Sequence, residues 1–264
     1  HSFVFEQLPT FLNEYNQSER KGLEPLPWLG ALVCASAFDL ALHDAYGMTN
    51  DLPTYQSYDF PYLNLDLSHF IEPKDGNSIS FAGKTPSDFL VLDPGDQIPV
   101  WHLVGGLDPL SEQECTGNEP RDGYPIHLEE WIERDGLNCL KIKLRGNDSH
   151  WDYARLLAIG KIAKEMNVDY LTTDFNCTVT DPHYVNQILD QLKIKDSKTW
   201  DKIIYVEQPF PYDLEKYGIK VHSLSKRKPL FMDESAHDWK HVRLGLELGW
   251  TGVALKTCKT QTGA

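Results

Sequence analysis

From residue 139 onward, short β-branched or aromatic runs alternate with stretches that have the apolar spacing of an amphipathic helix. Strand, helix and strand in repeating order predict a parallel sheet, because a parallel pair needs a long crossover connection. Units of this length suit a (β/α) barrel or a doubly wound sheet. No GxGxxG or GxxxxGK(S/T) loop follows a run, which weakens the nucleotide-binding versions of the second fold. The expected strands are 139–144, 169–175, 202–210, 228–235 and 252–258.

Capping signals predict where helices begin between these strands. Ser149 and Asp152 have the spacing of a capping box, which predicts a helix over 149–166. Asp181 is followed by Pro182, a residue favoured at the first helical position, so a second helix should begin there. Further helices are expected at 213–217 and 238–249.

The N-terminal part is less regular. Residues 29–46 keep small and apolar side chains at helical spacing and meet Gly47, which predicts a well-buried helix capped by this glycine. Residues 48–98 are rich in Pro, Gly, Asn, Asp and Ser, so we expect a long irregular insertion that could form a lid. A second loop is expected at 108–125, and no clear first barrel strand precedes Lys141.

Composition limits the partners. The chain has 264 residues, with 39 acidic against 25 basic side chains and a net charge of −14, which argues against nucleic acids and anionic membrane surfaces. The five cysteines are scattered and include no CxxC, which indicates a reducing, cytoplasmic setting. No membrane span or signal peptide is visible. We therefore expect no nucleic-acid or membrane partner. We also expect a small-molecule carboxylate substrate and a homo-oligomer.

Each predicted strand finishes in ionisable or amide side chains. A single acidic residue in this position is more often a helix cap or a solvated loop residue. Here, however, the intervals between successive strand ends are 31, 33, 26 and 23 residues, each about the length of one strand-helix unit. Five consecutive units therefore each place a charged residue at the same end of the sheet. In a (β/α) barrel the active site is built at that end. The side chains are Lys141 and Lys143, Asp174 with Asn176, Glu207, Asp233 with Glu234, and Lys256.

Three carboxylates that converge from consecutive strands would repel one another. A bound divalent metal resolves this conflict, and oxygen ligands suit a hard ion, Mg²⁺ above all, with Mn²⁺ as a substitute. We expect Asp174, Glu207 and Asp233 to be the ligands. Glu234 competes for the third position, since neighbouring residues of a regular strand point to opposite faces and the alternation alone does not choose.

The two lysines of the first predicted strand are two residues apart, so they project to the same side. A solvated strand edge is the ordinary interpretation of such a pair. In a sheet covered by helices, however, outward ammonium groups would be buried against apolar side chains, so Lys141 and Lys143 should point inward. Lys256 lies four strands later, on the opposite side of an eight-stranded barrel. Lys143 and Lys256 could then remove a proton from one face of a carbon and return it on the other.

This chemistry explains the residue types. Loss of a proton α to a carboxylate places charge on oxygens that are already negative, and a divalent ion stabilises the resulting enediolate. A lysine must be neutral to act as a base, and a second cation nearby lowers its pKa. Lys141 and the metal would both do this for Lys143.

The series KIK, DFN, EQPF, DES and the LK of VALKT resembles the enolase superfamily, and within it the muconate lactonizing enzyme subgroup. SAFDLALHDAYG resembles the helix of that family's capping domain, and PVWHLVGG the segment that leads into its barrel. The resemblance implies an α/β protein with a modified TIM-type (β/α) barrel. The barrel would be incomplete, with strands up to the sixth over 108–264. A partial α+β capping domain that lacks its small sheet would occupy 1–107, with the insertion at 48–98.

The resemblance also implies roles and a reaction. Residues Asp174, Glu207 and Asp233 would hold Mg²⁺, Lys143 and Lys256 would be the acid/base pair, and Lys141 would support them, with Asn176 and Glu234 beside the site. We expect a racemase or epimerase of an amino-acid derivative or dipeptide. Cycloisomerisation and syn-dehydration, as in muconate lactonizing enzyme and o-succinylbenzoate synthase, use the same parts and stay open. A non-catalytic metal-binding barrel is the alternative from another class.

Overall fold

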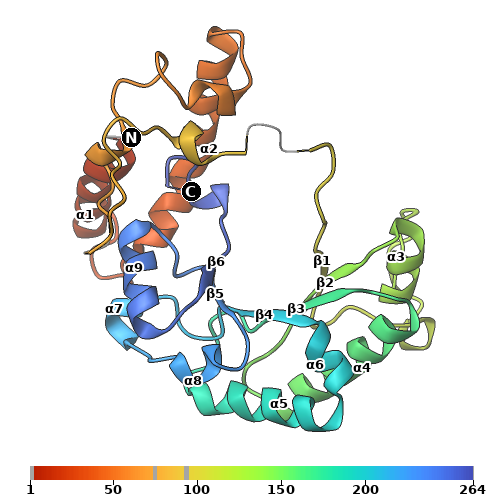
Figure 1. Ribbon diagram of the computed structural model, residues 1–264. Helices are drawn as coiled ribbons and strands as arrows, with labels where there is room; N and C mark the ends of the chain where they lie inside the picture. The colour runs from red at the N-terminus through yellow and green to blue at the C-terminus, as the bar shows by residue number, and fades with distance from the viewer. Residues whose placement is uncertain (1–2, 74–75, 92–94, 264) are drawn as a thin grey trace. The chain divides into compact units, whose positions relative to one another are not determined.

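The computed structural model describes residues 3–73, 76–91 and 95–263 (Figure 1). The chain divides into two compact units. Parts of the expected insertion, residues 74–75 and 92–94, lie outside the described residues. The first unit comprises His1–Gln97, His237–Trp239 and Leu255–Ala264, and the second comprises Ile98–Ala236 and Lys240–Ala254.

The second unit is built on a parallel sheet of six strands, each hydrogen-bonded to the next along the chain. A doubly wound sheet reverses its strand order at a switch point, whereas this order is sequential throughout. The expectation of an incomplete (β/α) barrel with strands up to the sixth is therefore confirmed. The strands are β1 (His102–Val104), β2 (Cys139–Lys143), β3 (Tyr170–Asp174), β4 (Ile203–Glu207), β5 (Leu230–Met232) and β6 (Gly252–Val253).

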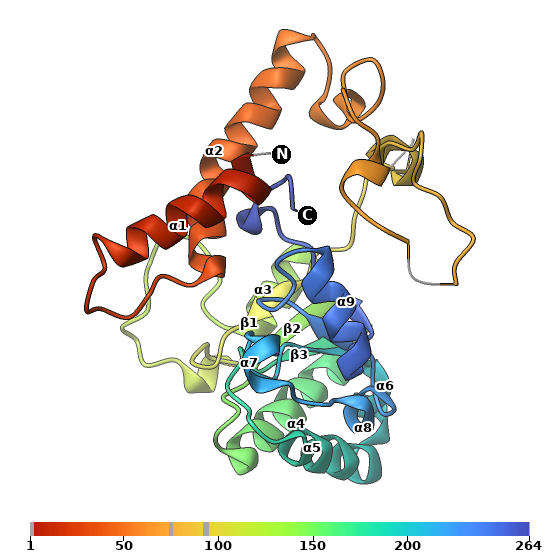
Figure 2. The ribbon, with the colours of Figure 1, turned by 90° about the vertical axis from the view of Figure 1, so that its left-hand side faces the viewer.

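Helices follow the strands and cover one face of the sheet (Figure 2). Leu140 and Ile142 of β2 are fully buried against them, together with Leu156 and Leu189 from two of the helices. Among the described residues, no helix is both long and apolar enough to cross a membrane. The helices are α3 (Leu128–Asp135), α4 (Ser149–Glu165), α5 (Pro182–Lys195), α6 (Ser197–Lys202), α7 (Leu214–Tyr217), α8 (His222–Ser225) and α9 (Trp239–Leu248).

The first strand was missed by the sequence analysis. The segment 99–106 contains β1, and Leu103 of β1 pairs with Lys141 of β2. Because β1 has only three residues, its apolar pattern is too short to be recognised. The sheet consequently begins before the expected boundary at residue 108, and residues 255–264 belong with the N-terminal unit.

The N-terminal unit contains α1 (Leu8–Gln17) and α2 (Trp28–Thr49). The expectation of a well-buried helix is wrong for α2, because Phe38 is 72% exposed. Gly47 does not cap this helix, which continues to Thr49. Instead, a Cβ on Gly47 would lie 2.9 Å from a backbone oxygen of the following turn.

No β-strand occurs among the described residues of the N-terminal unit, so the sheet part of a capping domain is absent from them. A π-helix covers Phe3–Gln7, and a short 3-10 helix covers Thr257–Lys259. The described part of 50–98 consists of irregular backbone and three 3-10 turns, at Thr54–Ser57, Leu67–His69 and Pro86–Phe89. In the expected loop at 108–125, a single 3-10 turn covers Glu112–Glu114.

The start of α4 differs from the predicted capping box. Asp148 caps the helix, since its carboxylate accepts a hydrogen bond of 3.0 Å from the backbone N–H of Trp151. Asp152 is fully buried and accepts bonds from the backbone N–H groups of Arg145 (2.7 Å) and Gly146 (2.9 Å) and from the Tyr184 hydroxyl (2.6 Å). Asp152 therefore holds the loop that follows β2.

The predicted start of the next helix is confirmed. Asp181 caps α5 with a bond of 2.9 Å from the backbone N–H of His183, and Pro182 occupies the first helical position. Here the sequence signal and the structure agree because both the cap and the proline act within one helical turn.

We predict that Asp152→Ala lowers the free energy of unfolding by about 3 kcal/mol, because three donors around a buried carboxylate lose their acceptor. Urea denaturation measures the change. The matched control is Asp148→Ala, which removes an exposed helix cap and should cost about 1 kcal/mol. An equal decrease in the free energy of unfolding in the two variants would contradict the role of Asp152 in holding the loop after β2.

Candidate metal centre

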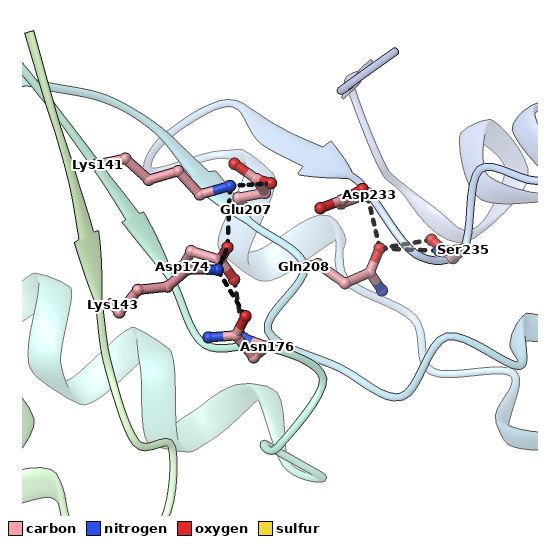
Figure 3. A network of polar contacts seen from close by, with 8 residues as sticks. All are labelled: Lys141, Lys143, Asp174, Asn176, Glu207, Gln208, Asp233 and Ser235. Carbon is pink, nitrogen blue, oxygen red and sulfur yellow. Dashed lines mark hydrogen bonds and ion pairs between the residues drawn. The ribbon is translucent and has the colours of Figure 1, made fainter. Parts of the chain in front are cut away.

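The carboxyl ends of three neighbouring strands lie side by side at one edge of the sheet. Asp174 at the end of β3 pairs in register with Glu207 at the end of β4, and Glu207 pairs with Phe231 of β5. Paired residues on adjacent strands point to the same face. Asp233, two residues after Phe231, comes from the end of β5, and Figure 3 shows it on the same side as Glu207.

The three carboxylates form a compact group. Asp174, Glu207 and Asp233 each offer one oxygen, and these oxygens all lie within 4.8 Å of one another. Their exposed fractions are 1%, 1% and 2%. The geometry brings together the three residues predicted as ligands, and the group contains Asp233 rather than Glu234.

Two lysines of β2 reach this group from the neighbouring strand (Figure 3). Lys141 Nζ donates to Glu207 Oε1 at 2.5 Å and lies 3.0 Å from Asp174 Oδ2. Lys143 Nζ donates to Asp174 Oδ2 at 2.5 Å and to Asn176 Oδ1 at 2.6 Å. Both side chains thus point to the inner face of the sheet, opposite the buried Leu140.

Burial and charge act against each other on these groups. Burial raises the pKa of Glu207 to about 6; the Lys141 ammonium opposes this, and the nearby Asp174 charge adds to it. For Lys141, burial lowers the pKa, but the bond to Glu207 and the charges of Asp174 and Glu207 outweigh it and raise the pKa above its usual range. The lysine and the carboxylates therefore stabilise each other's charged forms.

The residues fit a hard divalent cation. Three carboxylate oxygens that are almost completely buried within 4.8 Å form an all-oxygen donor set. Mg²⁺ is bound in proteins by a few carboxylates and keeps further positions for water or substrate oxygens. Three carboxylates without a metal would repel one another, and two lysine ammonium groups offset only part of that charge.

Asn176 and Glu234, predicted to lie beside the site, differ in their contacts. Asn176 adopts a left-handed conformation with φ of 48° and donates its backbone N–H to Asp174 Oδ1 at 2.8 Å, while its side chain contacts Lys143. Glu234 is half-buried and forms a hydrogen bond with the thiol of Cys177. Burial and the charge of Glu234 raise the pKa of this thiol, so Cys177 is neutral beside the site.

Lys256 follows β6 by three residues and lies in the segment Leu255–Ala264, which belongs to the first compact unit. Its role as the partner of Lys143 stays a prediction.

Gln208 was not singled out by the sequence analysis, although it stands in the EQPF run. It is fully buried, and its side-chain oxygen accepts bonds from Asp233 and Ser235 (Figure 3). A polar amide inside the predicted strand 202–210 was the available signal, since buried amides require hydrogen-bond partners.

Comparisons with known proteins give partial likenesses. No family model matches the chain. A mandelate racemase/muconate lactonizing protein from Herpetosiphon aurantiacus is 25% identical, with a TM-score of 0.42, over 50% of this chain and 36% of that one. A mandelate racemase/muconate lactonizing enzyme from Roseiflexus sp. is also 25% identical, with a TM-score of 0.41 and the same two shares. Muconate cycloisomerase from Pseudomonas fluorescens is 20% identical, with a TM-score of 0.40, over 50% of this chain and 34% of that one.

Among curated proteins, the snaclec salmorin from Gloydius brevicauda is 27% identical over 110 residues, which cover 39% of this chain and 70% of that protein. The chain spans little more than a third of the length of the solved structures above, with shares of 36%, 36% and 34%. The likenesses are thus limited to part of the chain, and the chemistry is argued from the residues of the site.

Proposed function

We propose that the chain is part of a Mg²⁺-dependent enzyme of the enolase superfamily, muconate lactonizing enzyme subgroup, that abstracts the α-proton of a carboxylate substrate. The proposal rests on one observation: three buried carboxylates from consecutive strands meet within 4.8 Å, beside two lysines of the preceding strand. Such an oxygen-only group suits a hard cation that keeps positions for substrate oxygens, and both lysines contact carboxylates of the same group.

Each residue has a stated task in this proposal. Asp174, Glu207 and Asp233 would hold the metal, which would supply positive charge to stabilise the negative charge that develops on the substrate's carboxylate oxygens. Lys143, in the neutral form that the positive charges of the metal and Lys141 favour, takes the α-proton at its Nζ. Lys141, held by Glu207 and Asp174, provides a fixed positive charge for the substrate carboxylate.

The two lysine positions support a particular reaction within this class. Lys143 ends β2, and Lys256 follows β6, the strand four places later in the sheet order. Bases on opposite sides of a substrate carbon favour racemisation or epimerisation of an amino-acid derivative or dipeptide. Cycloisomerisation and syn-dehydration need proton transfer on one face only, and they are the alternative outcomes of the exchange experiment below.

The proposal includes the setting of the protein. The net charge of −14 disfavours nucleic acids and anionic membranes as partners, and all five cysteines are free thiols. We propose a cytoplasmic homo-oligomer that acts on a small carboxylate.

Removal of any one ligand should abolish tight Mg²⁺ binding. Calorimetric titration should show this for Asp174→Asn, Glu207→Gln and Asp233→Asn. Each variant should lose more Mg²⁺ affinity than the ~10- to 100-fold that is typical when a residue supporting a ligand is replaced. The matched control is Asp201→Asn, an exposed aspartate of α6, which should leave the affinity unchanged. No Mg²⁺ binding by the folded unmodified chain would refute the metal site and the proposed function with it.

Metal affinity should fall as the pH drops below about 6. The pKa of Glu207 is raised to about 6 by burial, so this carboxyl takes up a proton at a higher pH than an ordinary glutamate and then competes with the metal. Titrations between pH 5 and pH 8 should show release of a proton on binding at the acid end. The control is proton uptake by the metal-free protein: between pH 8 and pH 5, potentiometric titration of Glu207→Gln should show about one bound proton fewer than the unmodified chain, and equal uptake would assign the titration to another residue.

In the presence of a dipeptide that the enzyme racemises, Lys143→Ala and Lys256→Ala should each fail to exchange the α-proton of one enantiomer with deuterated solvent. The reason is that each base acts on one face of the α-carbon. Proton NMR in D₂O measures the exchange, and Lys195→Ala, an exposed lysine of α5, is the control. Retained exchange with both enantiomers in both variants would overturn the two-base proposal. Exchange lost only in Lys143→Ala would indicate one-sided chemistry, and metal binding without exchange of any substrate would favour a non-catalytic barrel.

A further inference from the structure

Gln208 is the residue immediately after the metal-binding carboxylate of β4. Its side chain is 0% exposed, and its Oε1 accepts three hydrogen bonds: from the backbone N–H of Asp233 (2.7 Å), from the backbone N–H of Ser235 (3.2 Å) and from the Ser235 hydroxyl (2.7 Å). Its Nε2 donates to the carbonyl of Phe210 at 2.9 Å. Since the two backbone neighbours of Oε1 can only donate and the neighbour of Nε2 can only accept, the orientation of the amide is fixed.

The backbone of the same residue connects the other strand ends. Gln208 N–H donates to the carbonyl of Phe231 in β5 at 2.9 Å, and its own carbonyl accepts from the N–H of Cys177 at 2.8 Å, three residues after Asp174. Its φ of +29° lies in the left-handed region, which a residue other than glycine adopts only where its surroundings hold it. Gln208, which directly follows β4, is therefore hydrogen-bonded both to the segment after β3 and to β5.

We propose that Gln208 is a positioning residue of the metal centre, which sets where the Asp233 carboxylate lies relative to those of Asp174 and Glu207. This inference rests on the proposed function and deepens it, because it assigns the geometry of the third ligand to a side chain that touches no metal. Asp233 lies one residue beyond β5, past its last ladder pair of Met232 with Val253. Its carbonyl accepts the N–H of Ala236 at 2.9 Å, and the bond from its own N–H to Gln208 Oε1 connects it to the end of β4.

Loss of the amide has a direct physical consequence. Gln208→Leu keeps a similar volume but leaves the N–H groups of Asp233 and Ser235 without this acceptor in a buried site. The turn after β5 must then shift to satisfy them, and the Asp233 oxygen moves with it. Residues that support metal ligands in this way typically change metal affinity by ~10- to 100-fold when they are replaced.

The test compares Mg²⁺ binding by calorimetry in the full chain and in three variants. Gln208→Leu should weaken binding ~10- to 100-fold, and Ser235→Ala, which removes one of the three donors, should have a smaller effect. The control is Thr199→Val, which removes the hydrogen bond of another fully buried side chain, from Thr199 Oγ1 to Asp196 at 2.7 Å in the cap of α6. It should lower stability and leave the metal affinity unchanged.

A second measurement is independent of the metal. Hydrogen exchange of the amides of Asp233 and Ser235 in the metal-free protein should accelerate in Gln208→Leu and stay unchanged in Thr199→Val. If Gln208→Leu binds Mg²⁺ as tightly as the unmodified chain, or if its amides exchange no faster, the positioning role is overturned. If the unmodified chain itself binds no Mg²⁺, the proposed function fails, and faster exchange in Gln208→Leu then still shows that the amide holds Asp233.

Discussion

Mutual repulsion among the buried carboxylates of Asp174, Glu207 and Asp233 is the constraint around which this barrel end is built. Groups of like charge that are removed from water and held within 4.8 Å are costly unless cations face them. Two lysine ammonium groups supply part of the opposing charge from the neighbouring strand. A divalent ion supplies the rest in the proposed function, and the same unfavourable arrangement then becomes a binding site.

The sheet separates this charged site from the hydrophobic core by the alternation of side chains along each strand. On β2, Leu140 and Ile142 face the helices and are fully buried, while Lys141 and Lys143 face the carboxylates. On β4, Tyr205 stacks on Phe231 of β5 with ring centroids 4.2 Å apart, on the same face as Glu207. The face toward the helices thus forms the hydrophobic core, and the other face carries the carboxylates and lysines beside the Tyr205–Phe231 stack.

Sequence reasoning performed best where the signal is local and repeated. The strands from β2 to β6 and the Asp181 cap of α5 were predicted correctly because periodicity and capping act over a few residues. It failed for β1, which is too short to carry a pattern, and for the start of α4, where Asp148 and Asp152 are both acidic and only their three-dimensional partners distinguish them. It also failed for α2, whose exposed apolar side chains a sequence pattern cannot tell from buried ones.

By itself, the sequence determined that carboxylates and lysines end successive strands at intervals of one strand-helix unit, because parallel strands connected by helices must present those ends at one edge. Only the tertiary structure decided that Asp233, and not Glu234, completes the group. The two residues are adjacent in the chain and chemically alike, and the choice depends on strand register and on the hydrogen bond from Asp233 to Gln208. Such a bond joins residues 25 positions apart, and no local pattern encodes it.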